Sequence, residues 1–167
     1  LLRTGCSDFQ AITVFPQDDS RKFTIINVYD SPEQSSYKAR RKGLAEPSTL
    51  DLLFEFRAKT PNLGETLLVG DLNARTADKN TTPEELSDEY GPEVSYPISF
   101  PESDERISKD QTHNSRGALF LDFLACNNLQ ILNGCTLGDI FGDFTSVNYN
   151  GSSVVDYFAA TPNTRER

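Results

Sequence analysis

The stretch that most constrains the fold is an apolar run at residues 67–69 (Leu-Leu-Val), followed by Gly70, Asp71 and, two positions later, Asn73. Such a run bounded by a glycine is typical of a buried strand that ends in a tight turn. Side chains two positions apart share one side of an extended segment, so we expect Asp71 and Asn73 to face one ligand. Ligands of open α/β sheets bind at the carboxyl ends of strands. The stretch therefore predicts an α/β domain with a candidate site at this strand end. The same residues also fit a turn in which Asp and Asn bond their own backbone.

Length and composition indicate one domain that does not enter a membrane. The chain has 167 residues, 37% of them hydrophobic, which is enough for a sizeable core. No apolar run approaches the roughly 20 residues of a membrane span, and no signal peptide is recognisable. We therefore expect an intracellular location, nuclear or cytoplasmic. Three cysteines without metal-site spacing and a single histidine exclude a Cys/His zinc site of the usual kind.

The charge of the chain is strongly acidic but unevenly distributed. A formal net charge of −9 opposes simple binding to nucleic acid, which depends on phosphate contacts. Residues 78–110 contain ten Asp and Glu against three Lys and Arg, which is −7 of the −9. We interpret this segment as a surface loop, so the rest of the chain is close to neutral. Four basic residues within 38–42 fit either a phosphate-contacting rim or a solvated helix start.

Apolar periodicity and turn residues predict the other elements. Residues 9–15 and 22–29 alternate as two strands of a hairpin, and Ser48 is placed to cap a helix that ends near residues 60–64. A helix at 115–127 would turn four apolar side chains toward the core: Leu119, Phe120, Phe123 and Leu124. Residues 129–132 predict a short strand. Residues 144–148 and 154–159 predict a second hairpin around Asn150-Gly151.

Three ordered motifs carry a family resemblance. Residues 27–32 (Asn-Val-Tyr-Asp-Ser-Pro), 70–74 (Gly-Asp-Leu-Asn-Ala) and 152–158 (Ser-Ser-Val-Val-Asp-Tyr-Phe) together resemble the endonuclease/exonuclease/phosphatase superfamily. Residues 114–117 (Asn-Ser-Arg-Gly) and 148–158 make the chain most similar to endonuclease domains of retrotransposons that lack long terminal repeats, and to their domesticated relatives. The resemblance runs from about residue 9 to residue 163. It implies an α/β fold in which two packed sheets are flanked by helices.

The resemblance also implies an activity, a cofactor and a set of site residues. The activity is metal-dependent hydrolysis of a DNA phosphodiester, with Mg²⁺ or Mn²⁺ as the cofactor. Asp71 would activate the attacking water, Asn73 would contact the scissile phosphate, and both would help to hold the metal. Tyr29 would donate its hydroxyl to a phosphate oxygen. Thr145 would contact a phosphate or the backbone, and Asp156 would orient the catalytic histidine.

The sequence departs from the family pattern in two places. The family carries a Ser-Asp-His triplet downstream of the motif at Asp156 and a metal-binding Glu in an early strand, and this sequence has neither. Glu33 and Glu46 follow the Tyr29 motif, and His113 precedes Asp156, so none of them takes these places. We therefore expect residues 1–167 to form a single, partial domain.

Two origins and three functions follow from these departures. The chain is either an excerpt of a longer enzyme, with a reverse transcriptase fused to it, or an inactive copy. The leading function is a retroelement-type DNA endonuclease module, and we expect this chain by itself to be weakly active or inactive. The alternatives are a phosphatase of the same superfamily that acts on a soluble phosphate ester, and a catalytically dead domain that binds protein.

Overall fold

The computed structural model describes residues 8–15, 22–44, 46–81 and 106–162. The turn of the first predicted hairpin and most of the predicted acidic loop lie outside the described residues. No helix in the described ranges is both long and apolar enough to cross a bilayer. The elements, in chain order, are β1 (Phe9–Val14), β2 (Phe23–Tyr29), α1 (Ser36–Gly43), α2 (Thr49–Lys59), β3 (Glu65–Asp71), α3 (Ser115–Cys126), β4 (Gln130–Ile131), β5 (Ser146–Asn148), β6 (Gly151–Ser153) and β7 (Asp156–Ala160).

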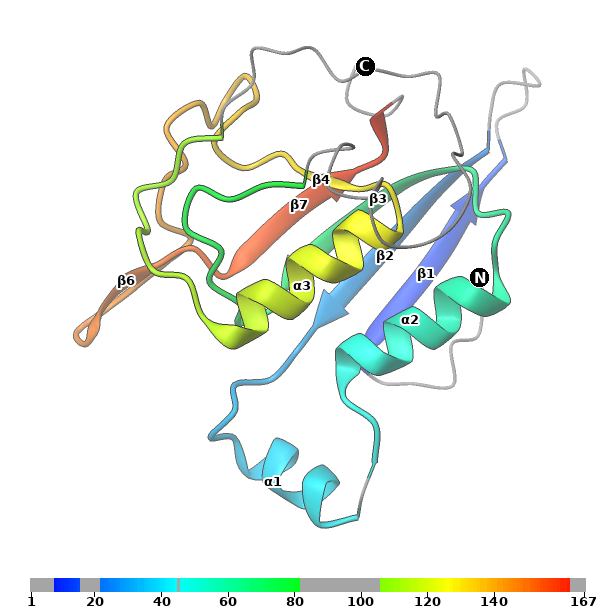
Figure 1. Ribbon diagram of the computed structural model, residues 1–167, viewed down its shortest axis with the longest axis horizontal. Coiled ribbons are helices and arrows are strands. Elements are labelled where there is room, and N and C mark those ends of the chain that lie inside the picture. The colour runs from blue at the N-terminus through cyan, green and yellow to red at the C-terminus, as the bar shows by residue number, and fades with distance from the viewer. Residues whose placement is uncertain (1–7, 16–21, 45, 82–105, 163–167) are drawn as a thin grey trace, which may run out of the picture.

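A mixed five-stranded sheet in the order β1-β2-β3-β7-β4 forms the centre of the molecule (Figure 1). The predicted hairpin of β1 and β2 is confirmed, with Phe9 opposite Val28. β2 and β3 are parallel, and α1 and α2 lie in the connection between them. β7 runs antiparallel to both β3 and β4. The carboxyl ends of β2 and β3 therefore meet the beginning of β7 at one edge of the sheet.

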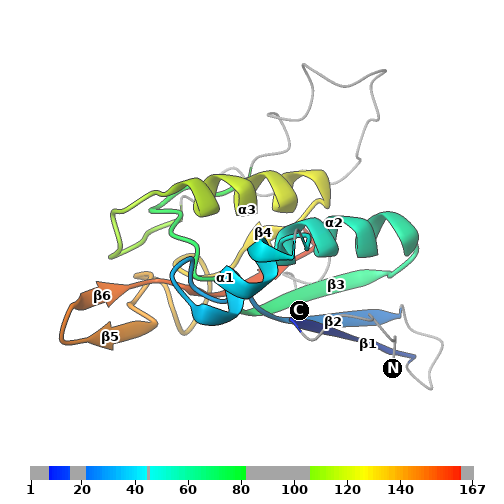
Figure 2. The same ribbon diagram turned by 90° about the horizontal axis from the view of Figure 1, so that it is seen from below.

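The helices α2 and α3 lie on one face of this sheet (Figure 2). Alternation along the strands sends Ile26, Leu68 and Tyr157 toward the helices, and each of these side chains is almost completely buried. The opposite face bears Ile12 and Phe158, which are 44% and 54% exposed. Within the described ranges, one helical layer thus covers one face of one five-stranded sheet. The predicted α/β class is confirmed, and a second, two-stranded sheet of β5 and β6 stands apart from the first (Figures 1 and 2).

A local sequence signal explains where α2 begins, and apolar periodicity explains most of the buried side of α3. Ser48 caps α2 as predicted: its hydroxyl accepts a hydrogen bond from the Asp51 amide at 3.1 Å, and the Asp51 carboxylate accepts from the Ser48 amide at 3.0 Å. On α3, Phe120, Phe123 and Leu124 are buried as predicted. The prediction for Leu119 was wrong, because this side chain is 56% exposed. The sheet covers only one side of α3, so the core-facing stripe is narrower than the apolar arc of the sequence.

The second predicted hairpin is correct in its turn and wrong in its second arm. β5 pairs with β6 across Asn148 and Gly151, so the partner strand is Gly151–Ser153 and not residues 154–159. Residues 156–160 instead form β7, which inserts between β3 and β4 in the main sheet. The change of sheet occurs at Val154, whose amide donates to Asp110 Oδ2 at 3.0 Å and not to a hairpin partner.

Candidate active site

Three predicted site residues lie in one row across the sheet. Tyr29, the last residue of β2, is directly opposite Asp71 at the end of β3, and Asp71 is directly opposite Asp156 at the start of β7. Side chains of directly opposite residues lie on the same face of a sheet, with Cβ atoms about 5 Å apart. This is the face that the helices leave open. Tyr29 is 55% exposed, and both carboxylates are half-buried.

The turn after β3 differs from the extended segment that the sequence predicts. Asn73 has a positive φ of 45°, so its side chain does not continue the alternation of the strand. Its amide donates to Asp71 Oδ1 at 2.9 Å, which is the backbone-bonding turn noted as the alternative. The Asn73 carboxamide nitrogen donates to the Asp30 carbonyl at 3.0 Å, in the loop after β2. Asn73 therefore lies beside the row, and the turn, not the alternation of the strand, sets the direction of its side chain.

Gly70 is required for the close approach of β2 and β3 at this point. Its φ is 137°, which L side chains rarely adopt. A Cβ atom there would lie 1.9 Å from the Val28 carbonyl oxygen. A side chain at this position would push apart the two strands that carry Tyr29 and Asp71. The glycine of the Gly-Asp-Leu-Asn-Ala stretch therefore has a steric role in assembling the row.

The electrostatics of the row raise the pKa of Asp71 above its ordinary value. Burial raises the pKa of Asp71, the hydrogen bond from the Asn73 amide offsets part of this, and the neighbouring charge of Asp156 raises the pKa further. The positive charge of Arg116 acts in the opposite direction but is the smallest of these influences. Two carboxylates on adjacent strands repel each other, and a cation between them would relieve that repulsion.

The Thr145 side chain contacts the backbone of this chain at the start of β7, and its role in substrate binding stays a prediction. Its hydroxyl oxygen accepts hydrogen bonds from the amides of Val155 and Asp156, both at 3.0 Å. The Thr145 amide in turn donates to the Ser153 carbonyl at 3.0 Å. These bonds fix the bend between β6 and β7. Thr145 thereby sets the position at which Asp156 enters the row.

Sequence reasoning missed the charged groups behind the row. Arg116 and Asp30 form a buried ion pair, although 86 residues separate them in the chain. A second pair joins Arg75 to Asp110, across 35 residues. Asp30 and Arg116 both lie inside the stretches that carry the family resemblance, which was the one signal available. His113 is exposed in the loop before α3 and is not part of the row.

The side chains at this edge of the sheet offer oxygen donors of the kind that Mg²⁺ binds. Mg²⁺ in proteins uses one or two carboxylates and retains several waters. Asp71 and Asp156 supply two carboxylates, and Asn73 supplies a carboxamide oxygen. In the part of the chain that the structure describes, no group of three or more His, Cys, Asp or Glu side chains could hold a metal. Two carboxylates and a carboxamide oxygen are oxygen donors of the kind that Mg²⁺ and Mn²⁺ prefer.

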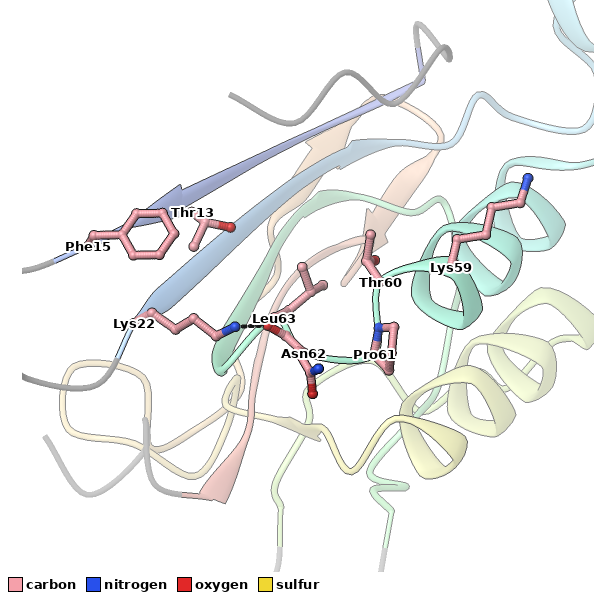
Figure 3. A pocket seen from close by; sticks show the side chains of 8 residues that line it. All are labelled: Thr13, Phe15, Lys22, Lys59, Thr60, Pro61, Asn62 and Leu63. Carbon is pink, nitrogen blue, oxygen red and sulfur yellow. Dashed lines mark hydrogen bonds between the residues drawn. The ribbon is translucent and has the colours of Figure 1, made fainter.

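A cavity of about 410 Å³ lies at the other end of the sheet, near the beginnings of β2 and β3 (Figure 3). One wall comes from the end of β1 and the other from the segment after α2. The Lys22 ammonium group donates to the Asn62 carbonyl across it. No predicted site residue lines this cavity, so it is separate from the row. Its lining residues are Thr13, Phe15, Lys22, Lys59, Thr60, Pro61, Asn62 and Leu63.

Comparisons with known proteins identify the fold. No family model and no curated protein matches the sequence. Among solved structures, the chain is similar to the endonuclease domain of TRAS1, a telomere-specific non-LTR retrotransposon, with a TM-score of 0.50 and 13% identity over 93% of this chain and 51% of that chain. A 3'-5' exonuclease (NExo) from Neisseria meningitidis matches with a TM-score of 0.49 and 17% identity, over 95% of this chain and 60% of that chain. The chain thus spans about half the length of the TRAS1 domain. The predicted resemblance is confirmed for the fold: this chain is similar in fold to the part of the TRAS1 endonuclease domain that it covers.

Proposed function

We propose that this chain is a divalent-metal-dependent phosphodiesterase of the retroelement DNA endonuclease type. The observation that carries the proposal is the row of Tyr29, Asp71 and Asp156 at one edge of the sheet, with Asn73 in the adjoining turn. Ligands of open α/β sheets bind at this kind of edge. The similarity of the fold to the TRAS1 endonuclease domain agrees with a nuclease.

Asp71 is the group in the row best suited to take a proton from water. A general base must lie within hydrogen-bond reach of the proton that it takes, and Asp71 lies in the centre of the row, between Tyr29 and Asp156. One of its oxygens is held by the Asn73 amide at 2.9 Å, which leaves the other oxygen to orient the attacking water. Asp71 would therefore take the proton from the water as the new phosphorus–oxygen bond forms, while the bond from phosphorus to the leaving sugar oxygen breaks and that oxygen takes a proton from solvent.

Tyr29 and Asn73 would bind the phosphate that reacts. The Tyr29 side chain is exposed beside Asp71, so its hydroxyl is placed to donate to a non-bridging oxygen. The Asn73 turn adjoins the same carboxylate. A divalent ion held by Asp71, Asn73 and Asp156 would supply positive charge to the phosphate oxygens. These residues supply orientation and charge stabilisation, which are the main requirements of phosphoryl transfer.

The overall charge supports a second candidate, a phosphatase acting on a soluble phosphate ester. A net charge of −9 weakens the attraction of a long polyanion more than that of a small ester. Competition separates the endonuclease from the phosphatase. An excess of a small phosphomonoester would occupy the site of a phosphatase and inhibit its reaction. The same excess would leave the nicking of DNA by an endonuclease almost unchanged.

The test is nicking of supercoiled plasmid in Mg²⁺ by the chain and by Asp71→Asn. The amide side chain keeps an acceptor for the turn but removes the base, so we expect nicking to fall about 10²- to 10⁴-fold. Asp122→Asn, at an exposed position on α3, is the matched control and should nick at the rate of the unsubstituted chain. EDTA should abolish the activity. Nicking that survives EDTA or Asp71→Asn would contradict the proposal.

A further inference from the structure

The Asn-Ser-Arg-Gly stretch at the start of α3 is attached to the loop that follows β3. The Asn114 side-chain oxygen accepts hydrogen bonds from the Gly117 amide at 2.8 Å and from the Arg75 amide at 3.2 Å. The Asn114 amide donates to the Arg75 carbonyl at 3.0 Å. A Cβ atom on Gly117 would lie 2.0 Å from that carbonyl oxygen, so the helix approaches this closely only because the position is a glycine.

This attachment places the Arg116 guanidinium between the loops that follow β2 and β3. Arg116 is 8% exposed. Its Nη1 donates to the Ser31 carbonyl at 3.1 Å, and its Nη2 donates to the Leu72 carbonyl at 3.1 Å and to the Asp30 carbonyl at 3.2 Å. Nη2 also pairs with the Asp30 carboxylate. One planar side chain thus connects two loops that belong to different strands.

The bonds of Arg116 to Asp30 and Leu72 reach residues that adjoin the row. The Asp30 carbonyl that accepts from Arg116 also accepts from the Asn73 carboxamide, at 3.0 Å. The Asp30 amide donates to the Asp71 carbonyl at 2.8 Å. Asp30 directly follows Tyr29, and Leu72 lies between Asp71 and Asn73. A shift of the guanidinium would therefore disturb Leu72, which directly follows Asp71, and Asp30, which directly follows Tyr29.

We propose that Arg116 is a positioning residue that holds the Tyr29, Asp71 and Asn73 segments in register for the reaction. This inference rests on the proposed function. A guanidinium presents donors in a rigid fork, and a lysine ammonium is a compact charge that cannot bridge the same carbonyls. A buried ion pair contributes little net stability compared with apolar packing, so stability alone does not account for a charged group here. A guanidinium is needed here because it can donate to backbone carbonyls of both loops at once.

The decisive measurement is backbone hydrogen exchange of Arg116→Lys, which reports on the loops without requiring activity. We expect the amides of Asp30 and Asn73 to exchange about tenfold faster, since both bond to Asp71. Arg57→Lys is the matched control, because Arg57 Nε donates to Asn127 Oδ1 at 2.9 Å at the opposite end of α3. The control should leave the exchange of Asp30 and Asn73 unchanged. Equal exchange at these two amides in both variants would overturn the inference.

Steady-state nicking then tests the consequence for the reaction. Displacement of reacting groups by about 1 Å costs on the order of 10²-fold in rate, so kcat should fall about 10- to 100-fold in Arg116→Lys while KM changes less than about threefold. An unchanged kcat together with faster exchange would overturn a positioning role.

Two further outcomes separate this inference from the proposed function. If the unsubstituted chain does not nick DNA in Mg²⁺, the proposed function fails, and the exchange measurement alone decides whether Arg116 orders the two loops. If Arg116→Lys does not fold, Asp30→Asn replaces it, because the amide keeps an acceptor oxygen for Nη2 but removes the charge. Asp30→Asn should show the same pattern of exchange with a smaller change, and an unchanged pattern would overturn the inference.

Discussion

Asp71 and Asp110 show how two environments shift the pKa of an aspartate in opposite directions. The Asp110 side chain is 2% exposed and accepts from Arg75 Nε at 2.7 Å and from the amides of Thr112 and Val154, both at 3.0 Å. Burial acts to raise the pKa of Asp110, but Arg75 and the two amides together outweigh it, so the pKa lies below its ordinary value. The ionised form of Asp110 is the form that the fold requires.

Asp71 is less buried than Asp110, and its pKa moves in the other direction. Burial raises the pKa, one amide bond from Asn73 offsets part of that effect, and the Asp156 carboxylate adds to it. No ion pair satisfies this carboxylate among the described residues. The comparison teaches that a carboxylate with a full set of donors holds the structure together. A carboxylate with too few donors is available to bind a proton or a cation.

The largest effect expected from this comparison is on stability, in Asp110→Ala. The substitution leaves two amides and the Arg75 guanidinium without their acceptor. Each buried donor left unsatisfied costs about 1–3 kcal/mol, and Arg75 is partly exposed, so we expect a loss of about 2–4 kcal/mol in the free energy of unfolding. Urea denaturation measures this. Asp143→Ala, which removes an exposed ion pair with Lys109, is the control and should change the value by less than about 1 kcal/mol.

Asp71→Asn should change stability in the opposite direction to Asp110→Ala. In a pH range where Asp71 is ionised, the fold carries the cost of a buried charge, and the amide removes that cost. We therefore expect the variant to be more stable than the unsubstituted chain at pH 7, by urea denaturation without metal. A variant less stable at pH 7 would show that the carboxylate is satisfied after all.

The pH dependence of the two carboxylates should also differ in sign. The pKa of Asp71 is raised in the folded state, so the folded state binds the proton before the unfolded state does as the pH falls. The free energy of unfolding of the unsubstituted chain should therefore approach that of Asp71→Asn between the folded pKa and about 3.9. The folded pKa of Asp110 is lowered, so its contribution is present above about 3.9 and is lost as the pH falls toward the folded pKa. Urea denaturation between pH 3 and pH 7 would detect both trends; parallel curves for the two variants would contradict them.

A smaller effect is expected from Asp156→Asn on the titration of Asp71. Removing the neighbouring negative charge should lower the pKa of Asp71, but burial is the larger cause and should keep the pKa above its ordinary value. Carboxyl ¹³C chemical shifts followed during a pH titration give this pKa directly. A pKa for Asp71 that does not change would mean that the two carboxylates do not interact across the strands.

The smallest effect is expected in Thr145→Val. The substitution removes the acceptor for the amides of Val155 and Asp156, but both bonds are exposed, so water replaces the hydroxyl. We expect a loss of about 1 kcal/mol or less in the free energy of unfolding. Thr145→Ser keeps the acceptor and should restore the value. If serine fails to restore it, the methyl group and not the hydroxyl matters.

Short-range patterns in the sequence were sufficient for most of the elements and for part of the row. The alternation of β1 and β2, the Ser48 cap and the apolar run before Gly70 each act over a few residues, so their outcome could be predicted locally. The ordered stretches around Tyr29, Asp71 and Asp156 predicted that these three side chains belong to one site. Their register then placed all three in one row. Their roles in catalysis stay predictions.

Only the tertiary structure decided how those side chains are held. The pairing of Arg116 with Asp30 joins residues 86 positions apart, and the Val154 amide, just before β7, donates to Asp110, 44 residues earlier in the chain. The sequence fitted either an extended segment or a turn at Asn73, and the structure has the turn. In this turn the Asn73 carboxamide contacts the loop after β2. Sequence alone determined most of the strands, the Ser48 cap and the chemical groups, because these follow from local backbone preferences and side-chain periodicity. Tertiary structure decided the partner of each charged group, because a buried charge is stabilised by whichever donors the folded chain brings within hydrogen-bond distance.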